Sequence, residues 1–553
     1  MWDRPIWMDD AFLLTNVHLQ MRNLLLSCNC SHFILVIIIL ASFLFSIDKL
    51  YSQLDLEPIV EPEKETLIPP PCVPDCRNET RVDFDTLNES GPDTVFVKDQ
   101  YVLTFSEDSL NCKRLIQISQ MNIHQIKIDS VLQANNISIV NDVVNTVKLL
   151  CQSDDRLVLD EIKKYYVKTF LDRILVESQA SEVNPIDNTI QKCLCDKEIY
   201  LYEGLDIESE GYVLATQTDD EFESNGGTIS RNLVIDSQEN TIDIPYVKFD
   251  TIGIDAPLNT NPNKIVAILD SGIDLYFFSD YIYAENQTDN CLEEDYWGWN
   301  FIDDSDNVQD VFGHGTLVAA SFKYTLDVES SRPNGIDYDY KILPVKVLDD
   351  CGFGTLYSVI CGLYYARAKG AHIVNASWGL YHHREQLEEA IIELAADDEI
   401  QIVASTGNDV NNVDVIDHFP SGYSSIYGSN NDFQTHVNVF AVGGLNQPYY
   451  MDERCSLDKW NETNYSSFTI VENAMGYSEL MNTQPYSNIE MESTNCTCEG
   501  TSYAAPRFSA ALVVEPNFNI YSIPYRVAQT NAYILYSYWT NKSCFSSSGQ
   551  SYD

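Results

Sequence analysis

The stretch from Lys264 to Asp274 reads KIVAILDSGID, a short apolar run that ends in an acidic turn. Four later segments have the same texture, each an apolar run that ends in small or polar residues: KILPVKVLDDCGFGT, AHIVNASWG, IQIVASTGN and VNVFAVGGL. Helical stretches lie between them, such as LYSVICGLYYARAKG and REQLEEAIIELAADD. This alternation predicts an α/β domain with a mainly parallel sheet. In such sheets functional residues lie beyond the carboxyl ends of the strands.

Three segments of this part of the chain carry side chains suited to acyl transfer. Asp270 ends the first apolar run, and a carboxylate there can hold an imidazole in one tautomer. His314 lies in VFGHGTLVAA, and imidazole has an ordinary pKa suited to proton transfer near neutrality. Ser502 lies in EGTSYAAPRFSAALVV at the expected start of a helix, where free N–H groups favour negative charge. Taken singly, each is more often a turn, cap or structural residue.

Taken together, the motifs resemble those of the subtilisin-like serine proteases, or subtilases. The resemblance rests on D-S-G-I at Asp270, G-H-G-T-L-V-A from Gly313 and G-T-S-Y-A-A-P from Gly500, in the order Asp, His, Ser. It covers about 247–526 and implies a three-layer subtilisin-like fold. Within the family, the chain looks most like proteinase K-type or vacuolar fungal subtilases.

The resemblance also implies roles for further residues. Asn408, in IVASTGND, stands where the family carries its oxyanion-hole asparagine. An extended substrate is expected to pair as an added strand, so that main-chain hydrogen bonds supply much of its affinity. The primary pocket is then lined by two short segments: Ser377, Trp378 and Gly379 on one wall, and Ala404, Ser405, Thr406 and Gly407 on the other.

Three positions depart from the family pattern without removing a catalytic group. They are Leu317, Tyr503 in place of a common Met, and Trp378, whose bulk is expected to narrow a subsite. No cofactor is required for the implied chemistry. Structural calcium is frequent in the family and acidic loops here could bind it, but the sequence places no ligands.

Composition excludes some classes of partner. The chain has 553 residues and a formal net charge of -50, which disfavours binding to nucleic acid phosphates. Its 15 cysteines include no repeated C-x-x-C pair at zinc spacing, so no metal site is predicted. Disulfides are expected if the chain enters an oxidising compartment.

The N-terminal apolar run FILVIIILASFLFSI, Phe33 to Ile47, suits a signal peptide or a signal anchor. Both would place the remainder in the secretory pathway, as a secreted, vacuolar or membrane-anchored protein whose contact with the membrane is this segment alone. Glycosylation acceptor triplets point the same way; they begin at Asn78, Asn88, Asn136, Asn286, Asn461, Asn464, Asn495 and Asn541.

We therefore expect five parts. These are a signal or anchor (1–50), a Pro- and Glu-rich linker (51–93), a small α+β propeptide that inhibits the enzyme (94–215), a processing loop (216–245) and the catalytic domain (246–553). The propeptide assignment rests on YVLTF and YVLAT as its first and last strands, with cleavage between Ala215 and Ile244. Cleavage is expected to release the mature enzyme.

The expected function is a serine endopeptidase that acts on proteins or peptides through an acyl-enzyme. Two alternatives remain open. One is an inactive subtilase-fold glycoprotein that acts by binding, and the other is a maturation protease of narrow specificity rather than a degradative enzyme.

Overall fold

The structure is a computed structural model. It describes residues 84–87, 94–106, 109–153, 155–177, 189–194, 197–203, 227–236, 262–284, 295, 297–331, 336–397, 399–411, 416–424, 435–445, 470–473, 500–514 and 533–534. These residues all belong to one compact unit, Pro69–Asp553. The apolar segment 33–47 lies outside them. Within the described part, no helix is both long and apolar enough to cross a membrane.

The second half of the chain forms a parallel sheet, which confirms the predicted α/β class. In the described residues its strand order is β14-β13-β12-β11-β10-β6-β8-β7, and each neighbouring pair is parallel. The strands are β6 (Lys264–Asp270), β7 (Trp299–Asn300), β8 (Tyr340–Lys346), β10 (Ile373–Ala376), β11 (Gln401–Ser405), β12 (Val439–Leu445), β13 (Ile470–Asn473) and β14 (Tyr533–Ile534). We call residues 262–534 the parallel-sheet region.

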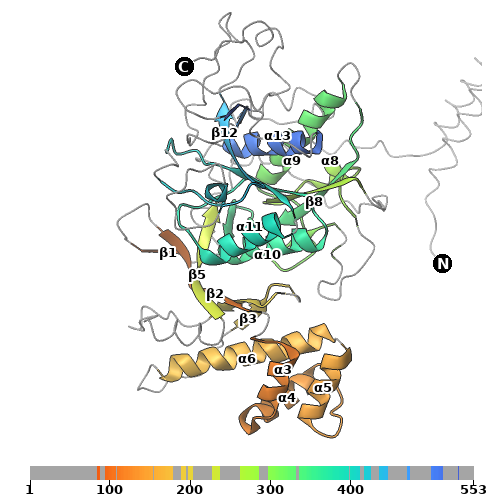
Figure 1. Cartoon of the computed structure of the whole chain (residues 1–553), viewed down its shortest axis with the longest axis vertical. Coiled ribbons are helices and arrows are strands. Elements are labelled where there is room, and N and C mark those ends of the chain that lie inside the picture. The colour runs from red at the N-terminus through yellow and green to blue at the C-terminus, as the bar shows by residue number, and fades with distance from the viewer. Residues whose placement is uncertain are drawn as a thin grey trace, which may run out of the picture. The chain divides into compact units, whose positions relative to one another are not determined.

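Helices cover both faces of this sheet (Figure 1). On one face lie α10 (Leu356–Ala368) and α11 (Glu385–Ala396), and on the other α9 (His314–Ser330) and α13 (Thr501–Val514). Strand β6 shows why two layers form, since Ala267 and Leu269 pack toward α10 while Val266 and Ile268 pack toward α9 and α13. The regular elements are completed by the short helices α8 (Leu275–Phe278) and η1 (Ser421–Tyr423).

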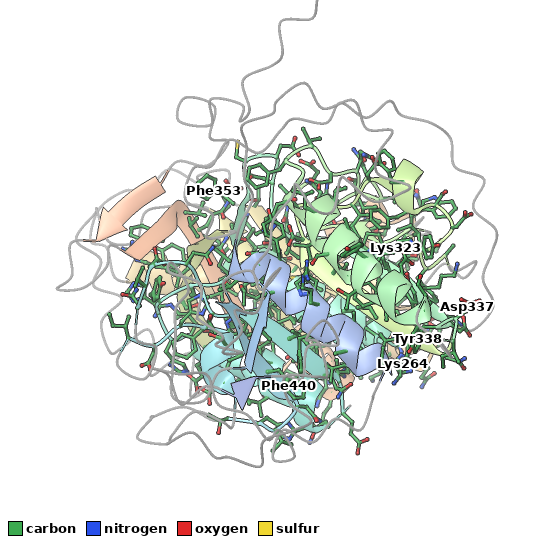
Figure 2. All side chains as sticks on the ribbon, turned by 90° about the horizontal axis from the view of Figure 1, so that it is seen from above. Lys264, Lys323, Asp337, Tyr338, Phe353 and Phe440 are labelled. Atoms are coloured by element: carbon green, nitrogen blue, oxygen red, sulfur yellow. A yellow bond between two sulfur atoms is a disulfide. The ribbon has the colours of Figure 1, made fainter. Side chains whose placement is uncertain are left out.

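Close helix–sheet contacts fix the spacing of these layers. Phe440 of β12, labelled in Figure 2, packs on Phe508 of α13 with ring centroids 5.0 Å apart. On the opposite face, Gly362 of α10 lies so near the sheet that a Cβ there would come within 2.6 Å of Val347 Cγ1. The absence of a side chain at Gly362 therefore lets α10 lie against the sheet.

Residues 84–236 form an antiparallel sheet with helices on one side, and we call them the N-terminal region. The sheet contains β1 (Phe84–Leu87), β2 (Thr94–Phe105), β3 (Thr189–Lys192), β4 (Ile199–Glu203) and β5 (Gly227–Asp236), and it continues into β9 (Phe353–Thr355). The helices are α3 (Cys112–Ser119), α4 (Asn122–Ala134), α5 (Val143–Ser153) and α6 (Arg156–Glu177).

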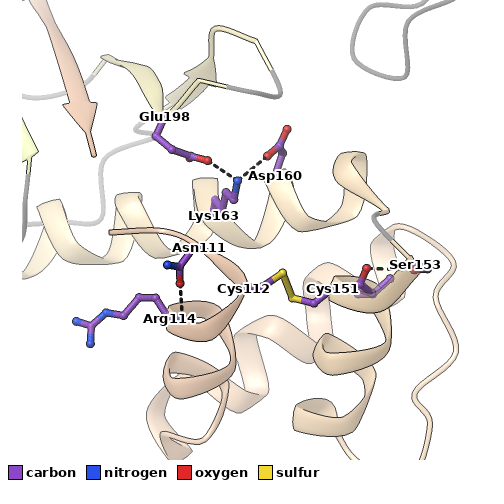
Figure 3. Close-up of a disulfide and its surroundings, with 9 residues drawn as sticks. Asn111, Cys112, Arg114, Cys151, Ser153, Asp160, Lys163 and Glu198 are labelled. Atoms are coloured by element: carbon purple, nitrogen blue, oxygen red, sulfur yellow. Dashed lines mark hydrogen bonds and ion pairs between the residues drawn. A yellow bond between two sulfur atoms is a disulfide. The ribbon is translucent and has the colours of Figure 1, made fainter. Parts of the chain in front are cut away.

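The helical layer has a disulfide, Cys112–Cys151, that joins α3 to α5 (Figure 3). Between α6 and the sheet, Lys192 Nζ lies 2.6 Å from Asp160 of α6, and Lys163 of α6 pairs with Glu198. These charges are largely buried, so their mutual pairing offsets the cost of removing them from water.

Two strands lie inside segments that were expected to be a linker and a loop. Strand β1 lies inside the expected 51–93 linker and pairs with β2. Its sequence, FDTL, is too short to reveal a strand by alternation. Strand β5 lies inside the expected 216–245 processing loop. Its polar N-terminal half hid the strand, although LVID at its end is apolar. The expected strand YVLAT lies outside the described residues.

Replacing Gly362 with Ala should destabilise the parallel-sheet region. The new methyl must displace Val347, whose β-branched side chain has little rotamer freedom, so overpacking of about 1–3 kcal/mol exceeds the roughly 0.5–1 kcal/mol gained in helix propensity. Urea unfolding should show a lower midpoint with an unchanged slope. An unchanged or higher midpoint would mean that α10 and the sheet can separate at little cost.

Candidate active site

Asp270 and His314 are in contact at the carboxyl end of β6. Asp270 is the last residue of β6, and His314 is the first residue of α9. His314 Nδ1 lies 2.7 Å from Asp270 Oδ1, and both side chains are fully buried. Asp270 Oδ1 also accepts a hydrogen bond from the backbone N–H of Ser271 at 2.7 Å. An Nδ1–H that donates to Asp270 leaves Nε2 as the basic nitrogen.

Gly315 allows this contact. A Cβ at Gly315 would lie 2.1 Å from the carbonyl oxygen of Gly272 and 3.1 Å from Asp270 Oδ1. The backbone after His314 therefore passes so close to Asp270 that a larger residue would push the two elements apart.

A second buried carboxylate, Asp310, holds the loops that carry Asp270 and His314. Asp310 Oδ1 accepts from Ser271 Oγ at 2.9 Å and from the Gly313 N–H at 2.8 Å. Asp310 Oδ2 accepts from the N–H and the hydroxyl of Thr316 at 2.8 and 2.7 Å. Ser271, which follows Asp270, and Gly313, which precedes His314, thus donate to the same oxygen, Asp310 Oδ1. Sequence reasoning missed Asp310, since nothing distinguishes it from its acidic neighbours.

Ser502 is fixed by reciprocal hydrogen bonds to Ser377, the residue after β10. Ser502 Oγ donates to the Ser377 carbonyl at 3.2 Å, and Ser377 Oγ donates to the Ser502 carbonyl at 2.8 Å. The second bond has a clear cause: Pro506, inside α13, has no N–H, so the helix cannot satisfy the Ser502 carbonyl itself.

The N-terminal turn of α13 also faces the candidate histidine. The Tyr503 ring centroid is 5.7 Å from that of His314, and Ser321 of α9 donates to the Tyr503 carbonyl at 2.9 Å. Helices α9 and α13 pack side by side on the same face of the sheet. The structure therefore brings the beginnings of the two helices, and with them His314 and Ser502, to one end of the sheet.

Asn408 follows β11 and is oriented by Thr501. Its Oδ1 accepts from the Thr501 N–H at 3.0 Å and from Thr501 Oγ1 at 2.9 Å. Because Thr501 Oγ1 itself accepts from the Gly407 N–H at 3.1 Å, its hydroxyl proton is available to Asn408. The Asn408 Nδ2 group is then directed toward Gly500, where a Cβ, if one were present, would lie 3.3 Å from Nδ2. An amide donor beside the start of α13 suits stabilisation of an oxyanion.

The residues expected to line the substrate pocket lie at the ends of β10 and β11. Ser377, Trp378, Ala404, Ser405 and Thr406 are fully buried in this structure. The indole of Trp378 packs in the core on the α10 face, so the expectation that its bulk narrows an open subsite is not supported. Gly379 and Gly407 are buried as well. Their contact with a substrate remains a prediction.

Within the described residues, no three His, Cys, Asp or Glu side chains are grouped so as to hold a metal ion. The expectation of structural calcium remains a prediction. Of the predicted glycosylation acceptors, Asn136 lies among the described residues and is exposed. Asn375 also begins an acceptor triplet but lies in an apolar run, where it is expected to be buried and unmodified; it is buried and bonded to Ser377 and Ser509.

The fold and the site define an α/β protein with an Asp, a His and a Ser gathered at the carboxyl end of a parallel sheet. Residues 261–538 match the sequence profile of the subtilase family. The chain belongs to the subtilase family.

Curated relatives agree with this assignment. Subtilisin BL of Lederbergia lenta is 30% identical over 226 residues, which are 40% of this chain and 70% of that protein. Thermitase of Thermoactinomyces vulgaris is 27% identical over 214 residues, 38% of this chain and 63% of thermitase. The cell wall-associated protease of Bacillus subtilis (strain 168) is 32% identical over 137 residues, 25% of this chain.

The chain therefore spans only part of several of these relatives, down to 14% of the cell wall-associated protease. Among solved structures, fervidolysin from Fervidobacterium pennivorans, a keratinolytic enzyme related to subtilisin, matches 78% of this chain and 57% of its own. Its identity is 14% and the TM-score is 0.41.

Replacing Asp310 with Asn should destabilise the protein. Asn keeps one acceptor oxygen but turns an NH₂ group toward two of the four donors, and hydrogen bonds to a buried charge contribute about 1.5–3 kcal/mol each. We expect the free energy of unfolding to fall by at least about 2 kcal/mol in chemical denaturation. Asp306→Asn, the same change at an exposed site in this loop, should leave it within about 0.5 kcal/mol. Equal effects of the two changes would contradict a special role for Asp310.

His418 should make stability depend on pH. Burial lowers the pKa of His418 to about 3, against about 6.5 in an unfolded chain. The unfolded chain therefore binds an extra proton between these pH values, so stability is full above about pH 6.5 and falls on acidification by about 1.4 kcal/mol per unit. At pH 5 the loss is about 2 kcal/mol. His418→Gln should flatten the slope between pH 6.5 and 4 by that amount, and parallel slopes for both proteins would refute the assignment.

Proposed function

We propose that this chain is a serine endopeptidase in which Ser502 is the nucleophile, His314 the general base and Asp270 the residue that orients and stabilises the imidazole. The observation that carries the proposal is the buried 2.7 Å contact between Asp270 Oδ1 and His314 Nδ1. This contact holds the imidazole with Nε2 as the base, as Asp–His–Ser catalysis requires. The proteases named among the relatives support the same reaction.

In the proposed reaction, the Ser502 hydroxyl first turns from the Ser377 carbonyl toward His314. His314 Nε2 then removes its proton as Oγ attacks the carbonyl carbon of a bound peptide. The tetrahedral intermediate places negative charge on the former carbonyl oxygen. The Asn408 side-chain amide and the Ser502 N–H, in the first turn of α13, are the proposed donors to that oxyanion. His314 then protonates the leaving amine, and water hydrolyses the acyl-enzyme by the reverse sequence of proton transfers.

We infer that the substrate is a protein or peptide bound in extended form beside Ser377–Gly379, with its side chain directed between that segment and Ala404–Gly407. Both segments follow buried strands, β10 and β11, that run parallel to one another. Main-chain pairing of this kind gives affinity with little demand on sequence, which favours a broad-specificity enzyme over a narrow maturation protease.

The protein is further proposed to be a latent precursor of the secretory pathway. Ser502 is 1% exposed and His314 is 0% exposed in this structure, which supports a latent form of the enzyme. The N-terminal region is the proposed inhibitory propeptide. Disulfides such as Cys112–Cys151 persist in oxidising compartments, which supports routing into the secretory pathway.

A fluorophosphonate probe tests the nucleophile. The intact chain should label slowly because Ser502 is buried, and the chain cut between residues 215 and 244 should label faster than the intact chain. Ser502→Ala should abolish labelling.

Asn408→Ala should lower kcat by about 10²–10³, since one oxyanion donor is lost. The exposed Asn135→Ala serves as the matched control and should retain full activity.

Absence of Ser502 labelling in the cut, folded protein would refute the endopeptidase proposal. It would leave the alternative of an inactive subtilase-fold protein that acts by binding.

A further inference from the structure

The N-terminal region and the parallel-sheet region share one hydrophobic core. Val102 of β2, Ile199 of β4 and Leu233 of β5 are buried in the same cluster as the residues of α10 and α11. On the opposite face of the antiparallel sheet, Tyr101 and Leu103 pack toward α6 instead. The antiparallel sheet therefore lies between α6 on one face and the α10–α11 layer on the other. Its contact with the α10–α11 layer consists of buried apolar side chains, as in the core of a domain.

Main-chain pairing extends this contact. Strand β5 is hydrogen-bonded to β2 on one side and to β9 on the other, with Val234 opposite Thr355 and Ile235 opposite Gly354. Strand β9 directly precedes α10. One antiparallel sheet thus includes strands of both regions, and a cut in the chain on either side of β5 would leave the sheet spanning the cut.

A buried side chain caps α10 from across the contact. Asn232 of β5 is fully buried, and its Oδ1 accepts from the Tyr357 N–H at 3.0 Å, while its Nδ2 donates to Gln100 at 2.8 Å. The Tyr357 N–H lies in the first turn of α10, where it has no partner within the helix. Separation of the two regions would break the bond between Asn232 and Tyr357, and water would take the place of each partner.

Charge pairing completes the contact at α11. Lys197, in the β3–β4 turn, lies 2.7 Å from Glu393, which also receives hydrogen bonds from Arg367 and from the Tyr364 hydroxyl. Burial works to raise the pKa of Glu393, but the bonds from Lys197, Tyr364 and Arg367 outweigh it and lower that pKa below its ordinary value. Of these three donors only Lys197 comes from the N-terminal region, so its bond is the one that crosses the contact.

A disulfide makes the contact covalent. Cys193, just after β3, is bonded to Cys361 in the middle of α10, across 168 positions of sequence. Cys361 is fully buried and Cys193 is 7% exposed, both within the shared core. The bond joins the proposed propeptide to the region that matches the subtilase profile, which begins only at residue 261.

We propose that the N-terminal region is a permanently retained part of the mature protein, held by Cys193–Cys361 after the chain is cut between β4 and β6. This inference rests on the proposed function and changes the expectation that cleavage releases the mature enzyme. Hydrolysis adds one water across one peptide bond and leaves the disulfide intact. Release would need a further two-electron reduction of the disulfide by a thiol, and that thiol would first have to enter a dry core.

Retention changes how the enzyme is controlled. A tethered inhibitory region acts at an effective concentration set by the tether, in the millimolar range for short connections, and not by the amount of protein in solution. If the N-terminal region is the inhibitor proposed above, activation then displaces it locally without releasing it, and the region can return. When the N-terminal region returns, the enzyme would lose activity without binding a separate inhibitor molecule.

The test uses the full chain with Ser502→Ala, which prevents self-cleavage, and with residues 237–244 replaced by the recognition sequence of a site-specific protease. After cutting, a non-reducing denaturing gel should show one species of full mass, and dithiothreitol should convert it to two fragments. Complete separation without reductant would overturn the proposal.

Two double variants provide the controls. Cys351 of the parallel-sheet region is also disulfide-bonded, so it is replaced by Ser in both variants. In that background, Cys193→Ser with Cys361→Ser should lose the full-mass species entirely. Cys112→Ser with Cys151→Ser removes the disulfide that lies within the N-terminal region, and it should keep that species. If a variant fails to fold, non-reducing peptide mapping of the unaltered chain decides, since a peptide pair that joins Cys193 to Cys361 supports retention. Alkylated Cys193, or Cys193 bonded to another cysteine of the N-terminal region, contradicts it.

A second measurement separates retention from catalysis. With Ser502 restored, the residual inhibition of the cut chain should be unchanged over a 100-fold dilution, whereas the Cys193/Cys361 variant should gain activity on dilution. An equal gain in both would overturn tethered control. A cut chain with no activity at any dilution contradicts the proposed function, while the gel result still decides covalent retention.

Discussion

The arrangement of Asp270 and His314 at the carboxyl end of the sheet depends on two buried carboxylates, Asp270 and Asp310, that both hydrogen-bond to Ser271. Each is fully removed from water, so each requires hydrogen-bond donors fixed in position. Ser271 links them, because its N–H serves Asp270 and its hydroxyl serves Asp310. The buried ammonium of Lys346 donates to the Ser271 carbonyl and brings a compensating positive charge. The position of His314 follows from this arrangement, since Gly313 and Gly315 are both bonded into it.

Buried polar groups that need fixed partners also join the N-terminal region to the parallel-sheet region. Asn232 and Glu393 are buried or half-buried polar groups whose partners come from both sides of the contact. A surface evolved only for transient association is typically more polar and wetter than this one. The shared core around Val102 and Cys361 instead resembles the interior of a single domain.

Much of the parallel-sheet region could be predicted from the sequence, because its strands are buried on both faces and read as apolar runs. Asp270, His314 and Asn408 follow such runs or begin helices, so parallel topology alone gathers them at one end. Strand β5 escaped prediction because its hydrogen-bond partners, β2 and β9, lie far from it in sequence. A strand that owes its form to distant partners shows little local pattern.

Other features depend on three-dimensional contacts that no local pattern contains. The pairing of Cys193 with Cys361 joins positions 168 residues apart, and cysteine spacing cannot select it among many alternatives. Trp378 was expected at an open subsite, but the direction of its indole follows from strand alternation beyond β10, which turns it into the core. In the sequence, Asp310 is one of several acids in its loop. Only the folded structure shows that four donors hydrogen-bond to it.

Pro506 has a consequence for how sequences of this family can change. Because residue 506 lacks an N–H, the Ser502 carbonyl relies on the hydroxyl at position 377. Any other residue at 506 would restore a helical donor and make that hydroxyl redundant, whereas loss of the hydroxyl alone would leave a buried carbonyl unsatisfied. Positions 377 and 506, 129 residues apart, are therefore expected to covary among homologues, with a hydroxyl at one wherever proline occupies the other.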